Sequence, residues 1–243
     1  MRLRNCRAEL LSAPGGCTLS LVFLGVDGHS NGWVAVAIDD NGFVGAQSFE
    51  SFAALIAENA SVKVVAVDIP FGLVDLPMRE ADQAARAILA GKSSSVFNAP
   101  SRRALSAPSY EQATAINLEV CKKGLSRQSY ALFEKIREVD AHESDKRVFE
   151  VHPEVSFRLI PHPLALQRKK SWGGMHARLA RLAAGGIVLP PSLGEADAVG
   201  IDDVVDAAVA AWSARRIHAG TARTFPQEPT QRSATGRAIA IWA

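Results

Sequence analysis

Residues 62–68 read VKVVAVD, and this stretch limits the choice of fold more than any other segment of the chain. Near-continuous apolar residues over this length are typical of a strand that is buried on both faces of a sheet. Residues 19–27 are similar, since an apolar run leads into Asp27 as the later run leads into Asp68. Two buried strands that each close with an aspartate predict an α/β protein.

The remaining pattern predicts a mixed sheet. Residues 32–38 and 42–49 alternate like strands and are joined by the turn sequence DDNG, so three antiparallel strands are expected before the strand at 62–68. We expect helices on both faces of this sheet and a helical insertion at about 79–140. The other predicted elements are helices at 50–59, 79–90, 109–123, 126–139, 153–159 and 175–184, a helix that begins near Gly200, and strands at 147–151 and 237–242.

A chain of 243 residues, with 48% hydrophobic and 21% charged residues, is expected to build one globular domain, here residues 19–243. Residues 1–18 are Arg-rich with a weak apolar centre and are expected to be a disordered extension or an over-long gene start, with a cleaved targeting peptide as the alternative. No apolar run is long enough to span a bilayer. Three widely spaced cysteines fit a reducing cytoplasm. The oligomeric state is left open, a homodimer included.

The segment GIDDVVDAAVA, residues 200–210, is an apolar helix that carries three aspartates. Helix capping explains Asp202 and, in part, Asp203, because acidic residues suit the first turn of a helix. It does not explain Asp206, which lies one turn further in among small apolar residues. Like charges this close repel each other unless a cation neutralises them, although a solvated acidic cluster is the commoner meaning of such a pattern.

Asp27 and Asp68 are expected at the same edge of the sheet, because adjacent parallel strands place their carboxyl ends together. An aspartate at the end of a buried strand is costly unless it is paired, hydrogen-bonded or bound to a metal. The alternative is that each aspartate only starts a turn. Residues 149–154, FEVHPE, end another predicted strand, and alternation places Glu150 and His152 on one face of it.

If this strand lies beside the first one, Glu150 would join the aspartates and His152 would serve as a general acid or base. Otherwise Glu150 pairs with an arginine and His152 packs as a satisfied polar residue.

Several motifs together resemble one known family. They are GVDGHSNGWV at 25–34, VAVDIPFGL at 65–73, READQAAR at 79–86, SSVFNAPSRRAL at 94–105, LSRQSYALFEKIREVD at 125–140, FEVHPEVSF at 149–157 and DDVVDA at 202–207. The chain is similar, from about residue 19 to residue 220, to the DUF429 family of uncharacterised proteins, which are described as predicted nucleases. The resemblance implies a ribonuclease H-like fold.

The resemblance also implies a metal site formed by Asp27, Asp68 and either Asp203 or Asp206. Mg²⁺ and Mn²⁺ prefer such oxygen ligands, and two of these ions activate water in phosphodiester hydrolysis. Many nucleases of this fold have a glutamate where this chain has Asp68, which reaches less far. Hydroxyl, guanidinium and ammonium groups in the shared motifs suggest a phosphate-binding surface, with a solvated polar surface as the alternative; these residues are Ser94, Ser95, Arg102, Arg103, Gln128 and Lys135.

Three functions are compatible with these features. The first is a metal-dependent nuclease that hydrolyses nucleic acid, with Asp27, Asp68, Glu150, His152, Asp203 and Asp206 as its catalytic residues. The second is a nucleotide-binding phosphotransferase of the actin and sugar-kinase type, although those proteins usually need two copies of the domain. The third is a non-catalytic binding module in which the carboxylates are structural.

Overall fold

The computed structural model describes residues 21–89 and 96–243, which form a mixed α/β structure around an open sheet of five strands in the order β3-β2-β1-β4-β5. The elements are β1 (Phe23–His29), β2 (Gly32–Asp39), β3 (Gly42–Phe49), α1 (Phe52–Glu58), β4 (Val64–Val67), α2 (Glu80–Ile88), α3 (Arg102–Leu105), α4 (Tyr110–Cys121), α5 (Arg127–Ala131), α6 (Phe133–Asp140), β5 (Val148–Glu150), α7 (Pro153–Leu159), α8 (Trp172–Ala184), the 3₁₀ helix η2 (Gly194–Ala198), α9 (Ile201–His218), β6 (Thr224–Phe225) and β7 (Ile241–Trp242). The predicted extension, 1–18, lies outside the described residues.

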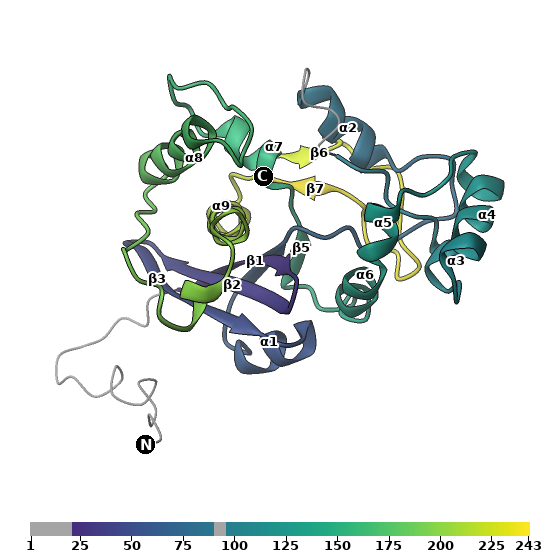
Figure 1. Cartoon of the computed structure of the whole chain (residues 1–243), viewed down its shortest axis with the longest axis horizontal. Coiled ribbons are helices and arrows are strands. Elements are labelled where there is room, and N and C mark those ends of the chain that lie inside the picture. The colour runs from purple at the N-terminus through teal and green to yellow at the C-terminus, as the bar shows by residue number, and fades with distance from the viewer. Residues whose placement is uncertain (1–20, 90–95) are drawn as a thin grey trace.

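The sheet has the mixed pairing that the sequence predicts. The strands β1, β2 and β3 form an antiparallel meander, and β4 and β5 continue the sheet in parallel with β1. Helix α9 lies against one face, as the view almost along its axis shows in Figure 1, and α1 lies on the other side of the sheet. Each face is therefore covered by its own hydrophobic core, one containing Phe52 and Leu55 of α1 and the other containing Val205 and Val209 of α9.

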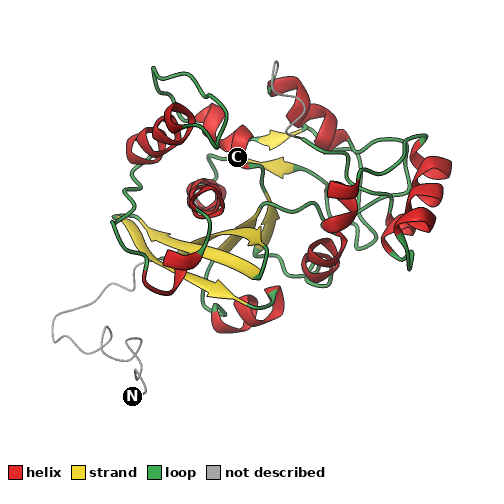
Figure 2. Cartoon of the chain, viewed as in Figure 1, coloured by secondary structure: helices red, strands yellow, loops and turns green. Residues whose placement is uncertain are grey.

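The helices α2 to α6 all lie between β4 and β5 in the sequence, where the helical insertion is predicted. Figure 2 shows two of them, α3 and α4, at the right of the view and far from the sheet. The helix predicted at 126–139 is two helices, α5 and α6, which meet at Leu132. Phe133, Ile136 and Val139 of α6 are buried in the same core as α1, so the break lets α6 turn toward the sheet.

Two strands differ from the prediction in ways that bear on the topology. The strand expected to end at Asp27 continues to His29, because the β1–β2 hairpin pairs as far as His29 with Gly32. The strand expected at 237–242 is limited to β7, which pairs with β6 in a separate two-stranded sheet. Among the described helices, none is both long and apolar enough to cross a bilayer.

Candidate functional site

Asp27 and Asp68 are neighbours at the carboxyl edge of the sheet. The parallel register of β1 and β4 pairs Val26 with Val67, so the two aspartates are the next residues on adjacent strands. The backbone N–H of Asp68 donates a hydrogen bond to the carbonyl oxygen of Val26 at 3.1 Å, which continues the ladder by one residue. The two aspartates therefore lie at the same edge of the sheet, as the sequence predicts.

Helix α9 brings the other two aspartates to this edge because it packs very closely on β1. A Cβ atom at Gly25 would lie 2.0 Å from the carbonyl oxygen of Ala207, so only glycine allows this contact. Asp27 lies two residues further along β1, about 6.6 Å at the usual rise of a strand. Asp203 lies four residues back along α9, about 6 Å at the rise of a helix. The contact at Gly25 thus aligns Asp203 with Asp27.

The charges of these side chains act on one another. Burial raises the pKa of Asp27 well above its ordinary value, and the negative charges of Asp68, Asp206 and Asp203 raise it further. Burial also raises the pKa of Asp68 to about 7 and that of Asp206 to about 6, although a nearby lysine opposes both shifts. Four carboxyl groups that repel each other in a poorly solvated place favour either protonation or a bound cation.

That lysine is Lys169, from the segment between α7 and α8. Its ammonium group lies 2.8 Å from Asp206 Oδ2 and 3.8 Å from Asp202 Oδ2. Burial disfavours the charge of Lys169, yet Asp206, Asp27 and Asp202 together raise its pKa above the ordinary value. Lys169 is therefore a cation supplied by the chain itself that partly neutralises the carboxylates of this cluster.

Glu154 is a fifth acidic group near the cluster. It lies in the first turn of α7, and its charge contributes to the raised pKa values of both Asp68 and Asp206. The guanidinium group of Arg178 in α8 forms an ion pair with it. Arg178 is only 1% exposed, so this pair anchors α7 to α8 beside the carboxylates.

The donor chemistry of the cluster fits a hard divalent cation, because all of its candidate ligands are carboxylate oxygens. The arrangement does not yet form a coordination shell. Among residues 21–89 and 96–243, no three His, Cys, Asp or Glu side chains are grouped so that they could hold a metal ion. The Lys169 ammonium occupies the position next to Asp206, where an ion would otherwise neutralise that carboxylate.

Glu150 lies on the other face of the sheet, contrary to the prediction that it joins the aspartates. The register pairs it with Val67, whose side chain belongs to the core beneath α1. Its carboxylate is buried against Arg79, with an Nη2–Oε2 distance of 2.6 Å. The predicted alternative, pairing with an arginine, is the one observed. His152 lies at the N-terminal boundary of α7 and is partly exposed.

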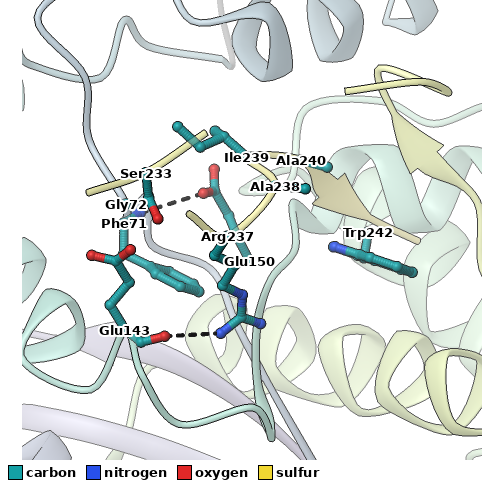
Figure 3. A pocket seen from close by; sticks show the side chains of 10 residues that line it. All are labelled: Phe71, Gly72, Glu143, Glu150, Ser233, Arg237, Ala238, Ile239, Ala240 and Trp242. Atoms are coloured by element: carbon teal, nitrogen blue, oxygen red, sulfur yellow. Dashed lines mark hydrogen bonds between the residues drawn. The ribbon is translucent and has the colours of Figure 1, made fainter. Parts of the chain in front are cut away.

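Glu150 instead supports the turn that follows Asp68. Its Oε2 accepts a hydrogen bond from the backbone N–H of Phe71 at 3.3 Å, while Asp140 accepts one from Gly72 at 3.0 Å. Figure 3 shows Glu150 beside Phe71 and Gly72 in a cavity of about 20 Å³, which is close to the volume that one water molecule needs. Glu150 therefore stabilises the backbone that follows Asp68.

The two arginines predicted to bind phosphate form ion pairs within the chain. Arg102 is held by both carboxylate oxygens of Asp140, at 2.8 and 2.9 Å, and Arg103 pairs with Glu119 at the surface. Gln128 is exposed on α5. The predicted residues Ser94 and Ser95 lie outside the described part of the chain.

Lys135 is the predicted phosphate-binding residue that is coupled to the carboxylates. Its Nζ donates to the carbonyl oxygen of Gly32 at 2.6 Å and lies 4.5 Å from the centre of the Trp33 ring. Burial lowers the pKa of Lys135, while the charges of Glu138, Asp27 and Asp203 act in the opposite direction. This lysine thus lies against the β1–β2 hairpin that carries Asp27.

Comparison with known proteins identifies the family to which the chain belongs. The model of DUF429, described as a protein of unknown function, matches residues 25–231, which include the aspartates and Lys169. The chain belongs to the DUF429 family. The resemblance seen in the sequence motifs is thereby confirmed. No curated protein and no solved structure matches the chain.

In this DUF429 protein, two residues of the site were not predicted as site residues. Glu154 had a signal, because it belongs to the same FEVHPE motif as Glu150 and stands two residues after His152. Lys169 had none, because it is one of five consecutive basic or polar residues, QRKKS, which resemble an ordinary solvated loop. Its role depends on how residues 161–171 fold back over α9.

Proposed function

We propose that this protein is a divalent-metal-dependent phosphodiesterase that hydrolyses nucleic acid in the cytoplasm, on a sheet of the ribonuclease H-like kind. The observation that carries the proposal is the meeting of Asp27, Asp68, Asp203 and Asp206 at one edge of the sheet, with raised pKa values. A bound cation would relieve their mutual repulsion, which makes metal binding favourable there. The strand order β3-β2-β1-β4-β5, with its antiparallel meander and parallel continuation, supports the architecture.

Asp27 and Asp68, with Asp203 or Asp206, would hold Mg²⁺ or Mn²⁺. When bound, such an ion supplies activation of a water molecule and neutralises charge that develops on the phosphate oxygens. Asp27 is oriented for this role by the N–H of Gly28, which donates to its Oδ1 at 2.7 Å. Lys135, beside the same hairpin, would contact a phosphate of the substrate through its ammonium group.

The experiment is a cleavage assay on fluorescently labelled single-stranded DNA, double-stranded DNA, single-stranded RNA and RNA–DNA hybrid, with Mn²⁺ or with EDTA. We expect cleavage of at least one substrate with Mn²⁺ and none with EDTA. Asp27→Asn should lose the activity by about 10²-fold or more, which is the scale for loss of electrostatic stabilisation in a reaction. Asp40→Asn is the matched control, because Asp40 is an exposed aspartate in the β2–β3 turn, at the opposite end of the sheet.

Cleavage that survives Asp27→Asn, or no cleavage of any substrate with Mn²⁺, would contradict the proposal. Including ATP as a substrate separates it from the phosphotransferase alternative. Metal-dependent release of phosphate from ATP, without nucleic-acid cleavage, would favour that second class instead.

A further inference from the structure

Lys169 enters the carboxylate cluster from a segment that the rest of the molecule holds in place. Its side chain is 40% exposed, whereas that of Asp206 is only 6% exposed. The ion pair therefore lies at the edge of a buried site, and the carboxylate of Asp206 is almost inaccessible to solvent. A surface pair of this length is worth little, but an acid this buried is costly to leave without a cation.

Two arginines of α8 fix the backbone of residues 161–171. Arg178 donates from Nη1 to the carbonyl oxygen of Gln167 at 3.0 Å, and Arg181 donates from Nη2 to that of Leu164 at 2.7 Å. Both arginines are buried, with exposed fractions of 1% and 7%. Buried guanidinium groups whose donors end on loop carbonyls hold that loop in one conformation, because each lost bond would leave a buried donor unsatisfied.

The turn next to Lys169 is also packed against the first turn of α8. A Cβ atom at Gly174 would lie 1.9 Å from the carbonyl oxygen of Arg168, so the backbones of these two residues are in direct contact. The Ser171 side chain caps α8 by accepting a hydrogen bond from the N–H of Gly174 at 3.1 Å. The position of Lys169 is thus set by backbone contacts on both sides of it and does not depend on the lysine side chain alone.

These contacts assign a role that deepens the proposed function and depends on it. We propose that the Lys169 ammonium takes the place of a second metal ion, so that the site binds one divalent cation through Asp27 and Asp68. Asp206 then serves as the partner of Lys169 and is not a metal ligand. A fixed ammonium group 2.8 Å from this carboxylate supplies the positive charge that a second ion would bring, without a coordination shell.

The test counts Mn²⁺ ions bound to the full chain by equilibrium dialysis, for the wild type and four variants. The wild type should bind one ion. Lys169→Arg keeps the charge and should also bind one, and so should Lys170→Met. Lys170 is the matched control, because its side chain is 82% exposed and its Nζ lies 3.9 Å from Asp202 Oδ2. Lys169→Met frees Asp206 and should bind a second ion.

The fourth variant, Asp206→Asn, tests the role of Lys169 independently, in case Lys169→Met folds poorly. The proposal predicts that Asp206→Asn still binds one ion with less than a threefold change in affinity. Loss of binding in Asp206→Asn would make Asp206 a metal ligand and overturn the proposal, as would two ions on the wild type, or one ion on a folded Lys169→Met. Those results would leave the proposed function standing. If neither the wild type nor any variant binds Mn²⁺, both the proposed function and the role proposed for Lys169 are contradicted.

Discussion

Gly25 of β1 lies directly against the backbone of Ala207 in α9, with no room for a side chain between them. A methyl group at Gly25 would approach the carbonyl oxygen of Ala207 and the backbone nitrogen of Ala211 to 2.0 Å each. The helix that carries two of the four carboxylates is therefore placed by the absence of a side chain on the neighbouring strand.

Replacing Gly25 by alanine should push α9 away from the sheet. We expect Gly25→Ala to lower the free energy of unfolding by about 3 kcal/mol or more, at or above the upper end of ordinary overpacking, because the clash is with backbone. Urea denaturation measures this. Gly45→Ala is the control, because nothing lies within 4 Å of a Cβ at Gly45 in β3. Equal stability of the two variants would show that α9 is not held as described.

The raised pKa values predict how stability depends on pH in the absence of metal. Asp68 has a folded pKa of about 7, above its unfolded value near 4, so the folded state binds its proton more tightly. Its stabilising contribution is then complete below about pH 4 and is lost as the pH rises to about 7. Asp206, with a pKa of about 6, acts in the same direction.

Asp68→Asn should remove much of the stability loss that the wild type shows as the pH rises. Thermal unfolding in EDTA should give similar Tm values for the variant and the wild type at pH 4. At pH 8 the variant should unfold at a temperature several degrees higher, since each kcal/mol corresponds to about 2–4 °C in a chain of this size. Asp40→Asn should follow the wild type at both pH values. A wild-type Tm at pH 8 that equals or exceeds that of Asp68→Asn would contradict the electrostatic description.

Arg79 neutralises two buried acids on the other face of the sheet. It lies 2.6 Å from Glu150 and 2.9 Å from Asp82, and all three residues are buried. Arg79→Met would leave both acids without a cation, which costs about 3–5 kcal/mol for a buried ion pair. Chemical denaturation should detect this loss.

Arg127→Met is the matched control for Arg79→Met. Arg127 faces Glu111 at 3.9 Å with 77% of its side chain exposed, so its loss should cost less than about 1 kcal/mol. A similar effect of the two substitutions would mean that the buried pair contributes no more than a surface one.

The sequence was sufficient to predict the five strands of the main sheet and the position of Asp27 and Asp68 at one edge of it. Both aspartates end apolar runs, and chain direction alone brings the carboxyl ends of parallel neighbours together. The placement of Glu150 could not be predicted in the same way. Alternation predicts that Glu150 and His152 share a face of their strand. Which face of the sheet this is depends on the register of the strand, because a shift of one residue moves both side chains to the opposite face.

Lys169 and Arg102 show a second limit. Whether a basic residue binds a substrate or an acid of its own chain depends on contacts between distant segments. Arg102 meets Asp140 across 38 residues and Lys169 meets Asp206 across 37, and no local pattern encodes either pair.

The most direct test of the account is a calorimetric titration of Mn²⁺ into the purified chain, into Asp27→Asn and Asp68→Asn, and into Asp40→Asn as the control. The account predicts saturable binding to the wild type and to Asp40→Asn, and its loss in both other variants. Asp27 in β1 and Asp68, the residue after β4, are neighbours at one edge of the sheet and would share one ion. Binding that survives either substitution, or no binding to the wild type, would show that this edge of the sheet is not a metal site.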